Sequence, residues 1–415
     1  MADYLTRAQD VFSKIDELAS ISENENYIAR TFGTPAFIEA SRKVALWMLE
    51  AGLDTRIDSI GNVRGKLESQ KPNAKTLVIA SHIDTVINAG KFDGPLGVLI
   101  GLNLLEHLAA QSITIPFNIE LIAFSDEEGV RFHTTYLGSK VVTGAFDFNL
   151  LKRLDKDGIS LKDVIKMMGS KPGLISQDAI TPENWLAYFE IHIEQGPVLD
   201  ERKIPVGLVT AIAGQKRVEI TFDGIPGHAG TVPMNMRQDA LTAASEFVLE
   251  VENFALRNQE KLVATVGKLE IVNAASNVIP GKVICSLDLR SSDASALDSA
   301  SGSLKNVLQE ISDKRSIKYH WQLVQETPPV TCDNNLNCIL KQAIEESGYD
   351  AIELISGAGH DAVPVSLVSP VCMLFVRCDK GISHNPLENT GLEDIAAAIR
   401  VSENFIHQLI KTNQN

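Results

Sequence analysis

Four apolar runs of this chain are each followed by side chains that can bind a metal ion, and this recurrence constrains the fold more than any other feature. The runs and their polar residues are TLVIA with His82, Asp84 and Asp93, FNIELIAFS with Asp126, Glu127 and Glu128, LAYFEIHIEQG with His192, and SPVCMLFV with His384. Short apolar runs between turn residues predict buried strands. Open α/β sheets bind ligands outside the carboxyl ends of their strands. We therefore expect one shared metal site in an α/β protein.

Each segment by itself also has a structural interpretation. His82 and Asp84 point the same way on extended backbone, yet a histidine beside aspartates is common in a solvated turn. The acidic triplet could open a helix, because carboxylates suit its positive end, although Gly129 favours a tight bend. The alternation around His192 could belong to a half-exposed strand. The recurrence on four strands favours the common site.

Length and composition predict a soluble globular protein with two domains. A chain of 415 residues is too long for one ordinary hydrophobic core. The net charge of −15 argues against a nucleic-acid partner, because such partners select a basic face. The five scattered cysteines, the absence of a signal-peptide core and the absence of a run of ~20 apolar residues predict a cytoplasmic protein with no membrane partner.

A segment of different character lies between the third and fourth runs. Residues 213–329 show the order strand, helix, two strands, helix, strand, which is that of the ferredoxin-like split βαβ unit. We therefore predict an α/β protein whose mixed-sheet, metal-binding catalytic domain (1–212 and 330–415) is interrupted by an α+β domain.

The motifs resemble one family over nearly the whole chain, the M20-type metallohydrolases, and within it the amidase, hydantoinase and carbamoylase branch. The stretches that carry the resemblance are SHIDTV, AGKFD, DEEGVRF, HIEQGPVL, GHAGTVPM, NVIPG, SGAGHDA and GISHNP. HIEQGPVL and GISHNP are specific to this branch, which includes enzymes for allantoate and for N-carbamoyl-L-amino acids. One departure is Val232, where many relatives have threonine.

The resemblance implies two divalent ions per subunit, Zn2+, Mn2+, Ni2+ or Co2+. The implied metal ligands are His82, Asp93, Glu128, His192 and His384. Asp93 would bridge the two ions, Glu127 would be the general base, and Asp84 would orient His82. Acidifying a water between two ions suits the hydrolysis of a carbon–nitrogen bond at neutral pH.

The resemblance also implies substrate contacts and a homodimer formed through the inserted domain, which would act as a lid. The implied substrate contacts are Gln195, Gln215, His228, Asn277, Arg290 and His360. His228 would stabilise the oxyanion from the partner subunit, and Arg290 would grip a carboxylate through two hydrogen bonds. Without the resemblance, Arg290 reads as a surface ion-pair former and His228 as a turn histidine.

The leading hypothesis is a dinuclear metal-dependent amidohydrolase acting on a small ureido acid. Such an enzyme would cleave the N-carbamoyl group of allantoate or of an N-carbamoyl-L-amino acid, releasing ammonia and CO2. One alternative is an M20-type aminoacylase or dipeptidase that acts on an N-acyl amino acid or a small peptide. Another is a non-catalytic metal-dependent binding protein, which the presence of Glu127 disfavours.

Overall fold

The computed structural model describes residues 2–111 and 113–414, and the chain forms two compact units. Unit 1 comprises the chain up to Thr210, then Cys332–Leu354, and the chain from Gly359 onward. Unit 2 comprises Ala211–Thr331 and Ile355–Ala358. The predicted insertion, 213–329, is shorter than unit 2 at both ends and lacks the four residues of the last segment. Each unit has its own hydrophobic core.

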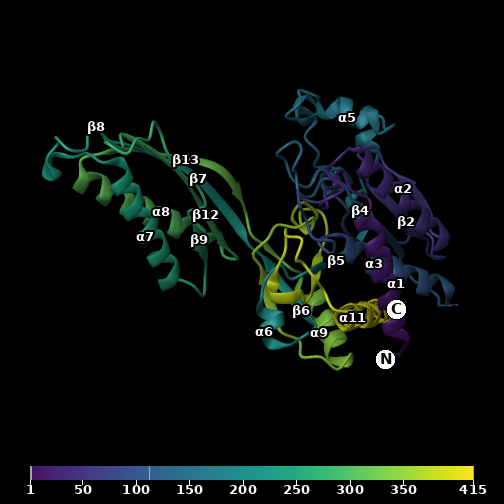
Figure 1. The fold of residues 1–415 in the computed structure, drawn as a ribbon. Coiled ribbons are helices and arrows are strands. Elements are labelled where there is room, and N and C mark those ends of the chain that lie inside the picture. The colour runs from purple at the N-terminus through teal and green to yellow at the C-terminus, as the bar shows by residue number, and fades with distance from the viewer. Residues whose placement is uncertain (1, 112, 415) are drawn as a thin grey trace. The chain divides into compact units, whose positions relative to one another are not determined.

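Four neighbouring parallel strands form the centre of a nine-stranded mixed sheet (Figure 1). Their order is β4 (Asn118–Phe124), β3 (Thr76–His82), β5 (Trp185–Ile193) and β16 (Val371–Val376). Each pair in this order is parallel, so the four carboxyl ends share one edge of the sheet. These strands are almost fully buried, as expected of parallel strands covered on both faces. They are the four apolar runs of the sequence.

Five further strands complete this sheet on both sides. The outer strands are β1 (Asp54–Ile57), β2 (Val63–Leu67), β6 (Val206–Ile212), β14 (Val330–Thr331) and β15 (Glu353–Ser356). β1 and β2 form an antiparallel hairpin around Gly61 and Asn62, with Ile57 opposite Val63, and β2, β6 and β14 pair antiparallel with β4, β16 and β6. Both parallel and antiparallel pairs are therefore present, which confirms the mixed α/β fold class.

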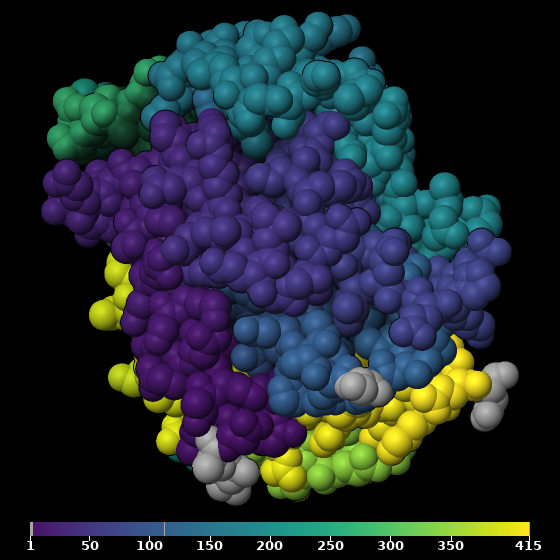
Figure 2. Space-filling view, turned by 90° about the vertical axis from the view of Figure 1, so that its right-hand side faces the viewer, coloured from purple at the N-terminus to yellow at the C-terminus, as the bar shows by residue number. Residues whose placement is uncertain are grey.

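Helices of unit 1 cover the sheet. They are α1 (Ala2–Ala19), α2 (Pro35–Glu50), α3 (Pro95–Ala110), α4 (Leu137–Val142), α5 (Leu161–Met167), α6 (Val198–Arg202), α9 (Asn334–Glu346), α10 (Ala362–Val365) and α11 (Leu392–Asn413). The Thr34 side chain caps α2 by accepting the Phe37 N–H. α1 and α11 lie side by side, where Arg7 pairs with Glu403, and Figure 2 shows purple N-terminal and yellow C-terminal segments low on one face.

Unit 2 is a five-stranded antiparallel sheet with two helices. Its elements are β7 (Gly214–Asp223), α7 (Ala240–Arg257), β9 (Val263–Thr265), β10 (Leu269–Ile271), β12 (Lys282–Ser291), α8 (Ala294–Arg315) and β13 (Lys318–Thr327). The sheet order is β10-β12-β7-β13, and β9 also pairs with β12. Alternate residues of β12, such as Val283, Leu287 and Leu289, are buried in the core with both helices. A short ribbon, β8 (Gly227–His228) with β11 (Val278–Ile279), lies outside this sheet.

The acidic triplet after β4 forms a tight bend rather than a helix. Asp126 and Gly129 both have left-handed backbone, with φ of 54° and 64°. The next helix, α4, begins only at Leu137. The bend therefore presents three carboxylates at the sheet edge. In the part of the chain that the structure describes, none of the helices has the length and apolar character required to span a bilayer.

Candidate metal centre

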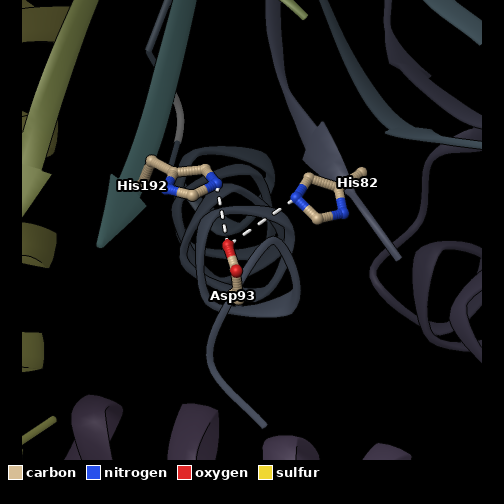
Figure 3. A group of neighbouring side chains, drawn as sticks. All are labelled: His82, Asp93 and His192. Atoms are coloured by element: carbon tan, nitrogen blue, oxygen red, sulfur yellow. Dashed lines mark ion pairs between the residues drawn. The ribbon is translucent and has the colours of Figure 1, made fainter. Parts of the chain in front are cut away.

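Two imidazoles from neighbouring strands converge on one carboxylate (Figure 3). His82 is the last residue of β3, His192 lies near the end of β5, and Asp93 lies just before α3. Nε2 of His192 is 3.2 Å from Oδ1 of Asp93, and Nε2 of His82 is 3.9 Å from the same oxygen. All three side chains are buried, with relative exposures of 2%, 2% and 6% for His82, His192 and Asp93.

The orientation of the two rings fits a cation at this place. The other ring nitrogen of His192 lies 2.9 Å from the Ile193 carbonyl oxygen, and that of His82 lies 3.1 Å from the Asp84 carbonyl oxygen. A carbonyl oxygen accepts a hydrogen bond, so each Nδ1 donates, and in the neutral imidazole each Nε2 lone pair faces Asp93. Oδ1 of Asp93 is buried and has no hydrogen-bond partner among the described residues. Two lone pairs and an orphaned carboxylate oxygen are a donor set for a divalent ion.

A second group of ligands surrounds the other oxygen of the same carboxylate. Nε2 of His384 is 3.0 Å from Oδ2 of Asp93 and 3.2 Å from Oε1 of Glu128. The ligand atoms of His82, Asp93 and His192 lie within 4.8 Å of one another, and so do those of Asp93, Glu128 and His384. Asp93 thus belongs to two clusters that could each hold an ion, one through each oxygen.

The side chain of Asp84 fixes the acidic bend. Its two oxygens accept the backbone N–H groups of Glu127, at 3.0 Å, and Glu128, at 3.1 Å. Its Oδ1 also lies 3.7 Å from Nδ1 of His82. Sequence reasoning expected Asp84 to orient His82 and tune the site, and its carboxylate also holds the backbone of the two glutamates. The signal for this second role is absent from the sequence, because Glu127 lies 43 residues after Asp84.

Without a cation the site holds an excess of negative charge. Burial opposes ionisation of His82, but Asp84, Asp93, Glu128 and Asp361 together raise its pKa to about 9. Hydrogen bonds to Asp93 and Glu128 raise the pKa of His384 to about 10. The pKa of Asp93 is lowered, since burial, which would raise it, is outweighed by His384, His192 and His82. The ligands thus attract positive charge, whether as protons or as metal ions.

Glu127 lies in the same buried bend, outside both groups around Asp93, but its ligand atom lies within 4.8 Å of those of His82 and Glu128 in a third group that could hold an ion. Burial raises its pKa well above the ordinary value, and the negative charges of Glu128, Asp361, Asp84 and Asp93 raise it further. Positive ions beside it would reverse that Coulomb effect and favour the carboxylate form. Its relative exposure is 8%, so proton transfer would take place largely shielded from bulk water.

Two predicted substrate contacts of unit 1 lie at the metal cluster. Nε2 of Gln195 is 3.0 Å from Oδ2 of Asp93 and 3.1 Å from Oγ of Ser383, so this amide is held by the metal cluster itself. The ring of His360 packs edge-on against His192, with centroids 4.6 Å apart. Burial, followed by the charges of His192 and His82, lowers the pKa of His360 well below the ordinary value, although Asp93 opposes this shift, so His360 is neutral at pH 7.

The four predicted contacts of unit 2 form two separate pairs. His228 is opposite Val278 in the β8–β11 ribbon, and the Ala229 N–H donates to the Asn277 carbonyl, so His228 and Asn277 are neighbours. Arg290 is opposite Gln215 at the start of β7. The ribbon adjoins the other end of β7 and β12. That end lies about 8 residues, or ~26 Å, along the strands from Arg290 and Gln215. Within one copy of unit 2, the structure does not bring the two pairs together.

The local contacts of these residues differ as well. His228 is exposed, and its Nδ1 accepts the Gly230 N–H at 3.0 Å, while the Val232 N–H donates to its carbonyl. The Arg290 guanidinium contacts Asp288 through two nitrogens and donates to the Gly357 carbonyl at 2.7 Å. Arg290 is thus an ion-pair former that is only partly buried.

Sequence reasoning missed several buried or half-buried polar residues near the metal cluster. Glu388 accepts the N–H groups of Phe92 and Asp93, Ser383 donates to Asp93, and Asp361 accepts a hydrogen bond from Ser139. Glu388 follows the GISHNP stretch by two residues, so an acidic residue beside a predicted ligand was the available signal. Asp361 had a similar signal, because it lies next to His360.

Comparisons with known proteins agree with this geometry. The family model of peptidase family M20/M25/M40 matches residues 78–408. The chain is 37% identical to allantoate deiminase 2 of Glycine max, over 96% of this chain and 89% of that protein. It is 35% identical to the N-carbamoyl-L-amino acid amidohydrolase of Geobacillus stearothermophilus, over 98% and 99% of the two chains.

A solved structure gives the same picture for the fold. The crystal structure of an amidase of the hydantoinase/carbamoylase family from Burkholderia multivorans superposes with a TM-score of 0.90 at 31% identity, covering 96% of this chain and 97% of that one. The family model and these relatives span both units, and the metal cluster lies within the matched residues. The chain therefore belongs to peptidase family M20/M25/M40, a metal-dependent family, and within it to the hydantoinase/carbamoylase amidases.

Proposed function

We propose that this protein is a dinuclear metal-dependent amidohydrolase that removes the N-carbamoyl group from a small ureido acid. The observation that carries the proposal is the convergence of His82, His192 and His384 on the two oxygens of Asp93. Names of the relatives support the substrate class, because the similar proteins act on allantoate or on N-carbamoyl-L-amino acids. The substrate of this chain would be one of these compounds or a close analogue.

The proposed ligands divide into two sets that share Asp93. His82 and His192 would hold one ion, and Glu128 and His384 the other. A pair of divalent ions supplies an acidified water as the nucleophile and polarises the substrate carbonyl. His192 and His82 are fixed for this task by their Nδ1 contacts with backbone carbonyls, which set the ring orientation. Zn2+, Mn2+, Ni2+ and Co2+ all suit such mixed nitrogen and oxygen ligands.

Glu127 would act as the general base and then as the general acid. It takes a proton from the attacking water and returns it to the amino nitrogen as the bond from that nitrogen to the carbamoyl carbon breaks. Asp84 holds the Glu127 backbone in place for both steps. The products are the free amine and carbamate, which breaks down to ammonia and CO2. A base buried in the bend keeps its proton from exchanging freely with water.

Substrate binding in this proposal involves both units. Arg290 would bind the substrate carboxylate with help from Gln215 and Asn277, and His228 would donate a hydrogen bond to the oxyanion. The two separate pairs in unit 2 support a homodimer, because one pair of each subunit could then serve a site of the other. Unit 2 would thus be the dimerisation and lid domain, and the protein would act in the cytoplasm.

A substrate panel tests the proposed function. The metal-stripped protein is reloaded with Mn2+, Zn2+, Ni2+ or Co2+ and assayed for ammonia release from allantoate and N-carbamoyl-L-amino acids. We expect turnover of at least one ureido acid that depends on added metal. Amino acid release from dipeptides or N-acyl amino acids, without ammonia release from any ureido acid, would instead favour the aminoacylase or dipeptidase alternative.

A further inference from the structure

The loop after β16 is tied to the loop before α3 by one buried carboxylate. Oε1 of Glu388 accepts the backbone N–H of Phe92 at 2.7 Å and that of Asp93 at 3.0 Å. Glu388 has a relative exposure of 4%, and 295 residues separate it from Asp93 in the sequence. These contacts fix the backbone of the residue whose side chain lies between the two ligand clusters.

The second oxygen of Glu388 acts on the Asp93 side chain through Ser383. The Ser383 hydroxyl lies 3.0 Å from Oδ2 of Asp93 and 3.3 Å from Oε2 of Glu388. Ser383 also contacts Nε2 of Gln195 at 3.1 Å, and it directly precedes His384 in the sequence. His384 has left-handed backbone, with φ of 53°, which is uncommon for a residue other than glycine. Glu388 therefore holds both the Asp93 loop and the loop that carries His384.

The space for this carboxylate depends on a glycine. A Cβ atom at Gly90 would lie 2.2 Å from Cδ and 2.4 Å from Cβ of Glu388, too close for either to remain in place. Gly90 is buried, and its backbone φ is not in the left-handed region. A side chain is therefore excluded at position 90 by Glu388 itself and not by backbone strain.

We propose that Glu388 is a positioning residue that sets the metal affinity of the centre by aligning Asp93 with His384. The inference rests on the proposed function in taking Asp93 and His384 as ligands of a metal ion. Glu388 contacts the backbone of one ligand and the serine beside the other, so its loss releases both loops at once. The ion held by Asp93, Glu128 and His384 is lost first, because two of its three ligands come from these loops.

Metal binding to the full-length protein tests this role directly. Metal-stripped wild type and Glu388→Ala are titrated with Mn2+ by calorimetry, and the melting temperature of each is measured with and without Mn2+. Removing an outer partner of a metal ligand typically weakens metal affinity ~10- to 100-fold. We expect a loss of that size for the weaker of two ions and a smaller metal-induced rise in melting temperature.

Two further variants separate positioning from a simple contribution to stability. Glu388→Gln keeps an oxygen that can accept both N–H groups, and we expect it to bind Mn2+ within ~threefold of the wild type. Gly90→Ala leaves every polar group in place but displaces Glu388, and we expect it to weaken Mn2+ binding as Glu388→Ala does. Gly65→Ala is the matched control, because its Cβ would lie 2.8 Å from Sδ of Met48, outside the metal centre.

The outcomes distinguish this inference from the proposed function. If the wild type binds two Mn2+ ions and both Glu388→Ala and Gly90→Ala bind them with unchanged affinity, the positioning role is wrong. The same holds if Gly65→Ala weakens binding as much as Gly90→Ala does, since the effect would then be general destabilisation. A wild type that binds no Mn2+, Zn2+, Ni2+ or Co2+ contradicts the proposed function and this inference together. If it binds two ions yet hydrolyses no ureido acid, the proposed function alone is contradicted.

Discussion

The candidate residues of unit 1 and those of unit 2 are held in different ways. In unit 1, His82, His192 and Asp93 are buried, and each has a second contact that fixes its orientation. In unit 2, His228 is exposed and Arg290 is bound to neighbours on its own sheet. The first set is preorganised within one subunit, whereas the second set divides into two pairs at opposite ends of the β7–β12 strand pair. In the proposed function, unit 1 holds the metal ligands and the general base, and unit 2 adds substrate contacts and the oxyanion donor.

The largest effect predicted for unit 1 is that of replacing the proposed general base, Glu127. Replacing it by glutamine removes the proton acceptor but preserves the shape of the bend, so kcat should fall about thousandfold. The bound metal, measured by elemental analysis, should remain. Glu128→Gln provides the contrast, because it should lose metal as well as activity. If Glu127→Gln kept more than about a tenth of the wild-type kcat, the assignment of the base would be wrong.

A mixed dimer tests whether unit 2 serves the site of a second subunit. His228→Ala should lower kcat about 100- to 1,000-fold, as the loss of an oxyanion donor does. When Glu127→Gln and His228→Ala chains are co-expressed with different tags and the mixed dimer is purified, one of its two sites would have both residues. We expect about half of the wild-type activity per dimer. A mixed dimer as inactive as its parents would show that His228 acts within its own subunit, and a fully active His228→Ala parent would show that His228 has no role in catalysis.

The variant Arg290→Lys tests whether unit 2 binds the substrate carboxylate. Lysine keeps the charge but cannot form two parallel hydrogen bonds, so KM should rise about 30-fold, equivalent to ~2 kcal/mol for a hydrogen bond to a charged group. The value of kcat should change less. The matched control is Arg217→Lys, since Arg217 pairs with the same Asp288 at 3.0 Å. Equal effects of the two variants would indicate that Arg290 acts through its ion pair with Asp288 and does not bind the substrate.

The pH dependence of metal binding tests the charge of the ligand clusters in unit 1. His82 and His384, with pKa values of about 9 and about 10 in the metal-free protein, are protonated at pH 7 and must lose that proton to bind metal. Because their pKa values are raised, metal affinity should increase with pH up to 9–10, by ~tenfold per pH unit for each proton released. Calorimetry in buffers of different ionisation enthalpy counts those protons. Release of no protons at pH 7 would contradict the raised pKa values.

The sequence predicted the strands and metal ligands of unit 1 better than it predicted the contacts between distant segments of that unit. The apolar runs predicted the strands, and β16 (Val371–Val376) lies within the run SPVCMLFV. Residue types and spacing also led to the expectation of one metal site, and the structure brings the five expected ligands into two adjoining clusters. The positions of Glu388 and Ser383 could not be predicted, since their partners lie 290 or more residues away in the sequence.

Local patterns determined the strands, the helices, the acidic bend and the chemical types gathered after each strand, because period and turn chemistry depend on neighbouring residues. Tertiary structure alone decided that four strands lie parallel in the order β4, β3, β5, β16, with their carboxyl ends at one edge. It also decided that Asp93 presents one oxygen to each ligand cluster, and that His228 and Arg290 lie near opposite ends of the β7–β12 strand pair. The physical reason is that hydrogen-bond pairing between strands sets which distant residues meet, and that pairing is not encoded in any single segment.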